Sequence, residues 1–151
     1  SVWDYPRPPR LEAVQDLIEV VFNEAVIAST SKAYRVLETS HPPTYYVPPS
    51  DIEMAYLIAA EQTTWCEWKG TAGYFDVEVD GRRARGAAWS YGRPMPGFEA
   101  ITDHLAFYCH LMDRCTVAGE PARPQPGHFY GGWITEKIVG PFKGEAGTRG
   151  W

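Results

Sequence analysis

Residues 70–91 read GTAGYFDVEVDGRRARGAAWSY, and this stretch decides which fold the sequence favours. Asp80-Gly81 near its middle is a pair that two-residue type I′ turns prefer. Before this pair, Phe75, Val77 and Val79 alternate with polar residues, as in a strand with one buried face. The stretch therefore predicts two antiparallel strands joined by a tight turn.

A two-residue turn would also fix which residues of the two strands face each other. It predicts three facing pairs: Glu78 with Arg83, Asp76 with Arg85, and Gly70 with Tyr91. The first two are pairs of opposite charge, which stabilise neighbouring strands. Further from the turn, the same face carries three aromatic residues, Tyr74, Trp89 and Tyr91. A face that changes from charged to aromatic along its length suits the rim of a pocket.

Other segments have the apolar and β-branched character of strands. They are Leu17–Phe22 and Ala25–Thr30, joined by a turn at Asn23-Glu24, then Ala33–Glu38, Thr44–Val47 between two pairs of prolines, and Leu105–Cys109. The apolar spacing in Leu11–Val21 also fits a helix, which remains the alternative to the first hairpin.

One helix is expected, from Asp51 to Ala60. Ser50 and Glu53 have the spacing of a capping box, and Asp51 lies where the first helical turn favours an acid. Ile52, Ala55, Tyr56 and Ala59 would share one apolar face of this helix.

Composition agrees with a turn-rich β protein. The chain has 151 residues, 14 glycines, 13 prolines and 14% aromatic residues. Its length favours one domain. We expect a mainly β, compact single-domain fold over residues 1–151, built like a barrel or sandwich from antiparallel hairpins with one or two short helices. Residues 1–13 are expected to be an extended, Pro-rich arm, and residues 114–151 a Gly/Pro/aromatic-rich C-terminal extension packed on the core.

Charge and cysteine content narrow the expected partners and location. The net charge is −5, which argues against nucleic acid or an anionic membrane as the partner. No apolar run is long enough to cross a membrane, and the first ten residues do not resemble a signal peptide. Three cysteines are too few for a disulfide scaffold and are odd in number. We therefore expect a reduced, cytoplasmic protein, while its oligomeric state stays open.

No metal or nucleotide motif is recognised in the sequence. The histidines and cysteines lack the HExxH and CxxC spacings, and there is no GxSxG, Walker or GxGxxG sequence. Cys109, His110 and Cys115 could together supply three metal ligands, but adjacent residues of a strand face opposite sides. We expect no bound metal and no organic cofactor.

Two segments carry candidate reactive groups. In Cys66-Glu67-Trp68-Lys69-Gly70, a lysine near a thiol would favour the nucleophilic thiolate, provided that the chain turns between Cys66 and Lys69. Glu38 ends a mostly apolar strand, where a carboxylate close to aromatic rings can act as a general acid or base. The alternatives are a half-buried cysteine, a solvated lysine and an exposed glutamate without a chemical role.

Tyr45 and Tyr46 lie between prolines, so their backbone is rigid. Because neighbouring residues of a strand face opposite ways, one of the two must point inward. That ring either fills the core or stacks on a ligand.

Four groups of residues resemble the domain of unknown function 427 family. They are Arg35-Val36-Leu37-Glu38, Tyr45-Tyr46-Val47-Pro48-Pro49-Ser50-Asp51, Cys66-Glu67-Trp68-Lys69-Gly70, and Ala88-Trp89-Ser90-Tyr91 with Pro94. Their order and spacing agree with the family from about Leu17 to Asp113. The resemblance implies a mostly β, barrel-like fold with little helix. It also implies one ligand site, lined by Glu38, Tyr45, Cys66, Lys69, Tyr74, Trp89 and Tyr91, but no reaction.

Three functions remain open. The first is a small-molecule enzyme or enzyme-like domain in which Glu38 is the acid or base, and Lys69 and Cys66 act in an aromatic-walled pocket. In that pocket Arg35, Tyr45, Tyr74, Trp89 and Tyr91 would bind the ligand. The second is a non-catalytic ligand-binding or stress-response domain with the same pocket. The third is a protein-interaction module that uses the aromatic tail.

Overall fold

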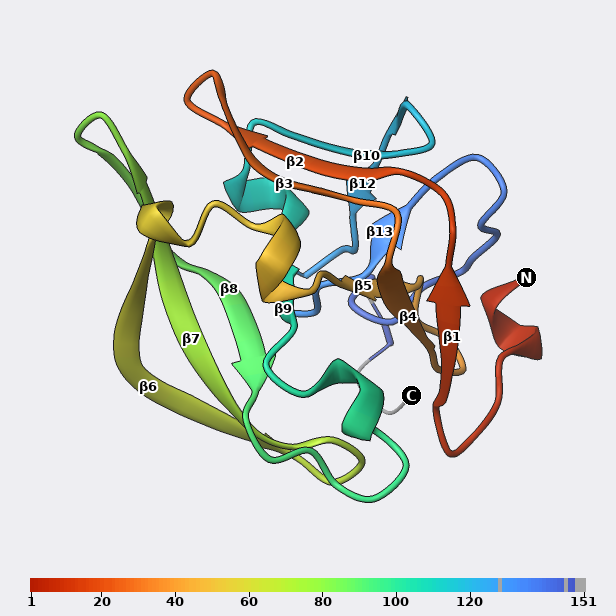
Figure 1. The fold of residues 1–151 in the computed structure, drawn as a ribbon. Coiled ribbons are helices and arrows are strands. Elements are labelled where there is room, and N and C mark those ends of the chain that lie inside the picture. The colour runs from red at the N-terminus through yellow and green to blue at the C-terminus, as the bar shows by residue number, and fades with distance from the viewer. Residues whose placement is uncertain (128, 146, 149–151) are drawn as a thin grey trace.

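The computed structural model describes residues 1–127, 129–145, 147 and 148, and its strands form open sheets of antiparallel strands (Figure 1). The expected mainly β fold is confirmed. The barrel is not, because the sheets do not close on themselves and instead pack in the manner of a sandwich. Within these described residues the helical segments are short 3₁₀ turns, and no helix is long and apolar enough to cross a membrane.

In the part of the chain that the structure describes, the strands form four sheets, in each of which neighbouring strands are hydrogen-bonded. The first contains, in spatial order, β1 (Arg10–Val14), β4 (Ala33–Leu37) and β5 (Thr44–Tyr46). The second contains β11 (Glu120–Pro121), β10 (Arg114–Val117), β2 (Ile18–Phe22) and β3 (Ala25–Thr30). The third contains β6 (Leu57–Cys66), β7 (Gly70–Val79), β8 (Arg82–Tyr91) and β9 (Leu105–Phe107), and the fourth contains β12 (Arg123–Pro124) and β13 (Trp133–Ile134). The 3₁₀ turns are η1 (Val2–Asp4), η2 (Pro49–Asp51), η3 (Met54–Tyr56), η4 (Glu99–Ile101) and η5 (Cys109–Leu111).

The first hairpin, β2 with β3, forms as expected, and the alternative helix over residues 11–21 is wrong. Its turn residues Asn23 and Glu24 both have positive φ angles, 49° and 67°, as a type I′ turn requires. Asn23 Nδ2 also donates to the carbonyl of Val79 at 2.9 Å, which ties this turn to the second hairpin.

The helix expected from Asp51 to Ala60 is wrong, because long-range pairing takes its residues. Asp51 accepts a hydrogen bond from Thr30 Oγ1 at 2.6 Å. Ile52 forms a β-bridge with Ala28, and the Glu53 amide donates to the Ile27 carbonyl at 2.8 Å. The chain therefore forms two separate 3₁₀ turns and then enters β6, which the sequence did not predict.

The register of the second hairpin is as predicted near the turn, where Asp80 and Gly81 both have positive φ angles. Val79 faces Arg82, and Glu78 faces Arg83. Beyond Val77 a bulge places three residues of β8, numbers 85–87, against Asp76 alone.

This bulge corrects two of the predicted pairs. Asp76 binds Arg83 instead of Arg85, accepting from its Nε at 3.0 Å, and it also accepts from the Gly86 amide at 2.7 Å. Tyr91 faces Ala72 and not Gly70. The bulge adds two residues, so the alternation of faces continues beyond it, and Tyr74 lies directly opposite Trp89.

The chain ends contribute to sheets and to packing. The last residues of the expected N-terminal arm, from Arg10 on, belong to strand β1, which pairs with β4. In the C-terminal extension, Trp133 is 1% exposed, and its Nε1 donates to the Phe107 carbonyl at 3.0 Å. Phe142 packs with Val2 and Ile134 in a separate apolar cluster. Trp151, also expected to pack on the core, lies outside the described residues.

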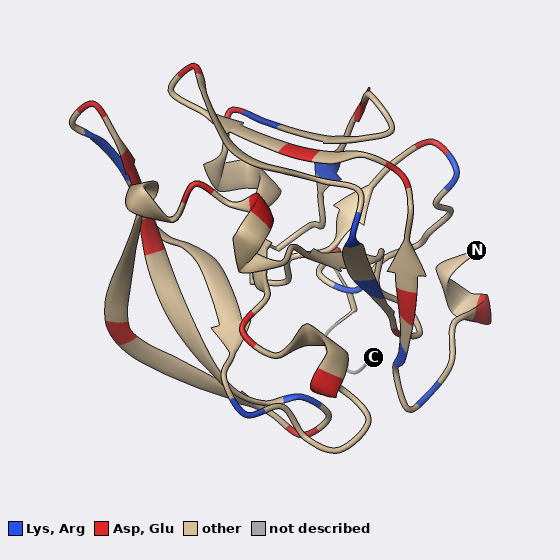
Figure 2. Ribbon diagram, in the orientation of Figure 1, with Lys and Arg blue, Asp and Glu red and all other residues tan. Residues whose placement is uncertain are grey.

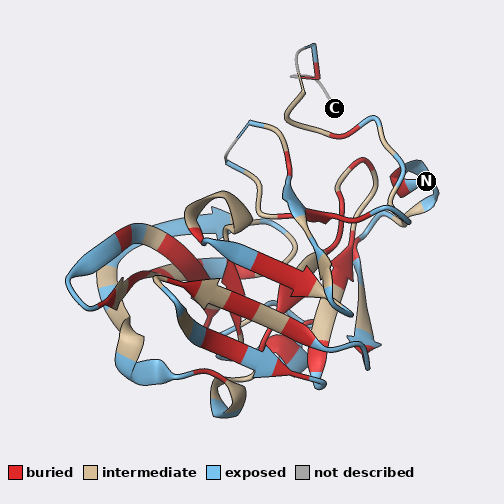
Figure 3. Ribbon diagram, turned by 90° about the horizontal axis from the view of Figure 1, so that it is seen from above, coloured by how far each residue is buried: buried red, intermediate tan, exposed pale blue. Residues whose placement is uncertain are grey.

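Buried and exposed residues alternate along several strands (Figure 3), and charged residues lie on strands as well as in loops and hairpin tips (Figure 2). The large apolar cluster occupies one side of the β6–β9 sheet and includes Val77, Val79 and Trp133. A second cluster on the opposite face contains Tyr74, Trp89 and Tyr91. The sheet therefore keeps an aromatic face that the main core does not use.

Candidate functional site

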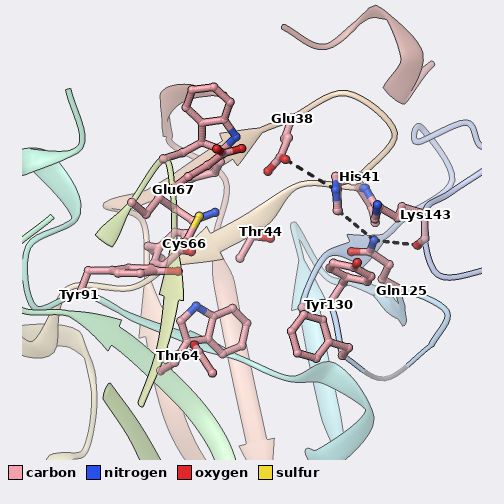
Figure 4. A pocket seen from close by; sticks show the side chains of 18 of the residues that line it. Glu38, His41, Thr44, Thr64, Cys66, Glu67, Tyr91, Gln125, Tyr130 and Lys143 are labelled. Carbon is pink, nitrogen blue, oxygen red and sulfur yellow. Dashed lines mark hydrogen bonds and ion pairs between the residues drawn. The ribbon is translucent and has the colours of Figure 1, made fainter. Parts of the chain in front are cut away.

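A cavity of about 530 Å³ lies over this aromatic face. One wall comes from β6, β7 and β8, and another from β4, β5 and the loop between them. The C-terminal extension closes the cavity on the far side, and Arg7 reaches it from the N-terminal segment. In Figure 4, Cys66 and Tyr91 lie on one side of the cavity, and His41, Gln125 and Lys143 on the other.

Most of the residues predicted for the site line this one cavity, although they come from separate segments of the chain. They are Glu38, Cys66, Lys69, Tyr74, Trp89 and Tyr91. Arg35 and Tyr45, which were expected to bind the ligand, do not line it.

Strand alternation explains the place of Tyr45. On β5, Thr44 and Tyr46 point into the cavity, so Tyr45 points to the other side of the sheet. There its ring packs 5.2 Å from that of Trp133. Arg35 faces Tyr45 across β4 and β5, and its Nε donates to Glu12 at 2.9 Å. The role expected of Tyr45 in the wall is therefore available to Tyr46.

The aromatic wall centres on Trp89. Its ring lies 4.6 Å from that of Tyr108, and 6.5 Å from those of Tyr46 and Tyr74. Burial raises the pKa of Tyr46 and of Tyr91, so both hydroxyls stay protonated at neutral pH. The wall thus combines flat apolar surface with neutral hydrogen-bonding groups.

Cys66 and Lys69 lie at the two ends of a tight turn between β6 and β7. Cys66 is the last residue of β6 and pairs with Gly70, the first residue of β7. Residues 67–69 form the turn, which is the geometry that a joint role of Cys66 and Lys69 requires. The Met95 amide donates to the Lys69 carbonyl at 3.0 Å and anchors the turn.

A chain of polar groups leads from the buried Gln125 to Glu38 (Figure 4). Gln125 Oε1 accepts from the Gly132 amide at 3.1 Å, and Nε2 donates to the Lys143 carbonyl at 2.9 Å. The same Nε2 lies 3.1 Å from His41 Nδ1. Because an amide nitrogen can only donate, His41 Nδ1 accepts, and the imidazole proton belongs on Nε2. His41 Nε2 lies 3.7 Å from Glu38 Oε2.

His41 is neutral at physiological pH. Burial lowers its pKa to about 4, and the nearby positive charges of Lys69, Lys143 and Arg7 act in the same direction. A neutral imidazole with its proton on Nε2 can donate to Glu38 or to a ligand placed between them.

Sequence reasoning did not find this polar chain. The sequence contains one signal for His41: in the segment His41-Pro42-Pro43, two prolines with a rigid backbone follow this titratable residue. Gln125, Tyr130 and Lys143 lie in the Gly/Pro-rich extension and share no periodicity. Only long-range contacts bring them to the cavity.

A second cavity of about 440 Å³ adjoins the first. The two share four lining residues, Thr64, Tyr74, Tyr108 and Phe129. Thr64 Oγ1 and the Tyr74 hydroxyl are hydrogen-bonded at 3.0 Å, so this shared boundary is fixed from the sheet side. Among the described residues, no group of three or more His, Cys, Asp or Glu side chains is placed to hold a metal ion.

Comparison with known protein families identifies a family for most of the chain. The family model described as a domain of unknown function (DUF427) matches residues 10–118. No curated protein matches the chain. The matched region contains Glu38, His41, Cys66 and Lys69, whereas Gln125 and the other cavity-lining residues of the C-terminal extension follow it.

Proposed function

Because this chain belongs to the DUF427 family, whose description names no reaction, we propose its function from the cavity itself. The protein is a small-molecule-acting enzyme in which Glu38 is the general acid or base, and Lys69 and Cys66 act in an aromatic-walled pocket. The observation that carries the proposal is the Gln125–His41–Glu38 chain, which ends on a carboxylate at the cavity surface.

The proton-transfer role rests on the fixed imidazole. Gln125 holds His41 in one tautomer, so His41 always presents Nε2–H on the side of Glu38. This arrangement presents an N–H group to the Glu38 carboxylate and orients it. Glu38 then exchanges a proton with the ligand, and His41 acts as the positioning residue.

Lys69 and Cys66 supply the complementary groups. The Lys69 ammonium is suited to hold an anionic group or to stabilise negative charge that develops during the reaction. The Cys66 thiol, half-buried at the same turn, is a candidate nucleophile. Both line the cavity together with Glu38, although they lie about thirty residues further along the chain.

The same proposal places the protein in the cytoplasm, where thiols stay reduced. All three cysteines are free in the structure, and Cys109 Sγ donates to the Ala122 carbonyl at 3.3 Å. Cell fractionation with an antibody against the native chain tests this location.

Activity can be tested without a known substrate. The purified protein is incubated with a cell metabolite extract, and consumed and produced compounds are followed by mass spectrometry. We expect the wild type to consume at least one compound, and Glu38→Gln to slow this consumption by about a hundredfold or more. The same compound should still be retained by the variant in a pulldown, since the walls of the cavity are unchanged.

Glu53→Gln is the matched control, because Glu53 does not line the cavity. Consumption that is equally fast in Glu38→Gln and wild type would contradict the acid-base role. Retention of a compound without its consumption would favour the non-catalytic ligand-binding function, which uses the same cavity.

A further inference from the structure

We propose that the ligand of this cavity is a planar aromatic anion, a ring system that carries a carboxylate or phosphate group, and that the C-terminal extension selects it. This inference rests on the proposed function only in taking the cavity as the ligand site. It adds the chemical class of the ligand and names the part of the chain that determines it.

The first observation is a set of cations without carboxylate partners. Arg7, Lys69 and Lys143 line the cavity, and none of them forms an ion pair with any residue that the structure describes. Elsewhere in this acidic chain some arginines pair with carboxylates, as Arg82 does with Asp113 at 2.8 Å and Arg83 with Asp76 at 2.9 Å, and others do not. The three cavity cations differ from the other unpaired ones in that they line this one cavity. Unmatched cations around a cavity favour an anionic ligand.

The second observation is that these charges act at one place. The positive charges of Lys69, Lys143 and Arg7 all help to lower the pKa of His41, which lies inside the cavity wall. The cavity also contains two carboxylates, Glu38 and Glu67, so the cations outnumber the acids. A cationic ligand would meet three like charges, whereas an anionic one gains from them.

The third observation is the surplus of aromatic surface. Besides the buried Trp89 and Tyr91, the cavity is lined by Trp65 and Phe129, whose side chains are 69% and 66% exposed. Large rings that stay exposed at a cavity mouth mark a surface that a ligand covers. Aromatic side chains of the sheet and of the C-terminal extension both line the cavity and offer ring faces on which a flat ligand can stack. A cavity of about 530 Å³ is in the usual range for small-molecule sites.

The extension supplies the elements that make the site selective. Lys143, Phe129 and Tyr130 all follow the region matched by the family model, and Lys143 Nζ lies 5.9 Å from the centre of the Tyr130 ring. Arg7 precedes that region. The family region therefore provides the proposed reactive groups. The added segments provide two of the three cations, Arg7 and Lys143, and two of the aromatic residues that line the cavity, Phe129 and Tyr130.

Close backbone approach holds this wall in place. A Cβ atom on Gly131 would overlap the indole of Trp89, and one on Gly132 would lie 2.6 Å from Gln125 Oε1. Only glycine allows the extension to pass this near to the sheet and to Gln125. The adjoining Tyr130 is thereby held at the cavity.

The experiment measures binding of matched probes by calorimetry to the full chain. The probes are naphthoate, naphthyl phosphate, the neutral naphthylmethanol, the cationic naphthylmethylammonium and the non-aromatic cyclohexanecarboxylate. We expect at least one naphthyl anion to bind about tenfold or more tightly than the alcohol, the ammonium and the non-aromatic acid. The two anions together show whether a carboxylate or a phosphate fits.

Variants locate the bound anion. Lys143→Met should weaken naphthyl-anion binding about fivefold, which corresponds to about 1 kcal/mol, and leave the weak binding of the alcohol unchanged. Lys137→Met is the matched control, because Lys137 is exposed and lines neither cavity. Circular dichroism of each variant reports whether it is folded.

The outcomes separate this inference from the proposed function. Equal binding of the alcohol and the anions, or no binding of any probe, overturns the ligand class, whether or not the wild type consumes a metabolite. Tight anion binding that Lys143→Met does not alter overturns the role of the extension. Tight, Lys143-dependent binding combined with no metabolite consumption supports the ligand class and contradicts the enzyme.

Discussion

The cavity has one wall made of strands and one made of loops, and the two are held by different forces. The strand wall, with Trp89 and Tyr91, is fixed by backbone pairing with β7 and β9. The loop wall is formed by the part of the C-terminal extension that follows β11, with Tyr130 and Lys143, and its only strand pairing among the described residues is the short β12–β13 sheet. It is anchored instead by the hydrogen bonds of Trp133 and Gln125. A site built in this way can keep its chemistry on the sheet and change its ligand by changing the loops.

The largest expected effect concerns the anchor of the loop wall. Trp133→Ala should lower the free energy of unfolding by about 3–5 kcal/mol, because it empties a fully buried site in the main core. Urea denaturation measures this change. Phe129→Ala is the control within the same wall, and its cost should stay within about 0.5 kcal/mol because the ring is exposed. A small cost for Trp133→Ala would show that the loops are only loosely attached.

A smaller effect is expected where the two walls touch. Gly131→Ala should lower the free energy of unfolding by about 1–3 kcal/mol, since the added methyl group overlaps Trp89. Gly73→Ala is the matched control, because a Cβ there meets no atom within 4 Å. Thermal unfolding compares the two variants. Equal melting temperatures for both would mean that the loop wall does not press on the strand wall.

The smallest effect is electrostatic and depends on pH. The folded protein holds the pKa of His41 at about 4, below its ordinary value of 6.5, so the unfolded chain binds a proton that the folded one does not. Stability is therefore lost as the pH falls below about 6.5. Between about pH 7 and about pH 5.5 the wild type should lose about 1 kcal/mol more than His41→Gln does.

Urea denaturation at the two pH values measures this difference. Equal losses in both proteins would show that His41 is not held neutral by burial and by the cations of the two walls. Lys69→Met should raise the pKa of His41 in the folded protein, because it removes one of those cations, and an NMR titration of the His41 ring measures this change.

The sequence predicted what depends on local turn chemistry. Asp80-Gly81 and Asn23-Glu24 set both hairpins, because positive φ angles at two adjacent residues leave the chain little other choice. The expected helix over residues 51–60 failed because its capping pattern competed with partners on β3, which only the folded chain brings near. Local signals are decisive only where no distant partner competes.

The candidate site divides along the same line. Tyr74, Trp89 and Tyr91 could be predicted to share one face, since strand alternation fixes it. The sequence could not predict that Tyr46 lines the cavity instead of Tyr45, because strand alternation shows that one of the two faces it but not which one. The loop-wall residues Gln125 and Lys143 were missed for a further reason: their positions depend on single long-range contacts that leave no pattern in the sequence.

The bulge opposite Asp76 has a consequence for how this hairpin can vary in length. It adds an even number of residues to β8, so the parity of every later position is conserved, and Trp89 stays above the cavity. An odd insertion or deletion at the same place would invert that parity and send the indole into the main core. Length changes in this strand are therefore tolerated in steps of two. The bulge accommodates them at the point where the Asp76 carboxylate accepts a hydrogen bond from the Gly86 amide.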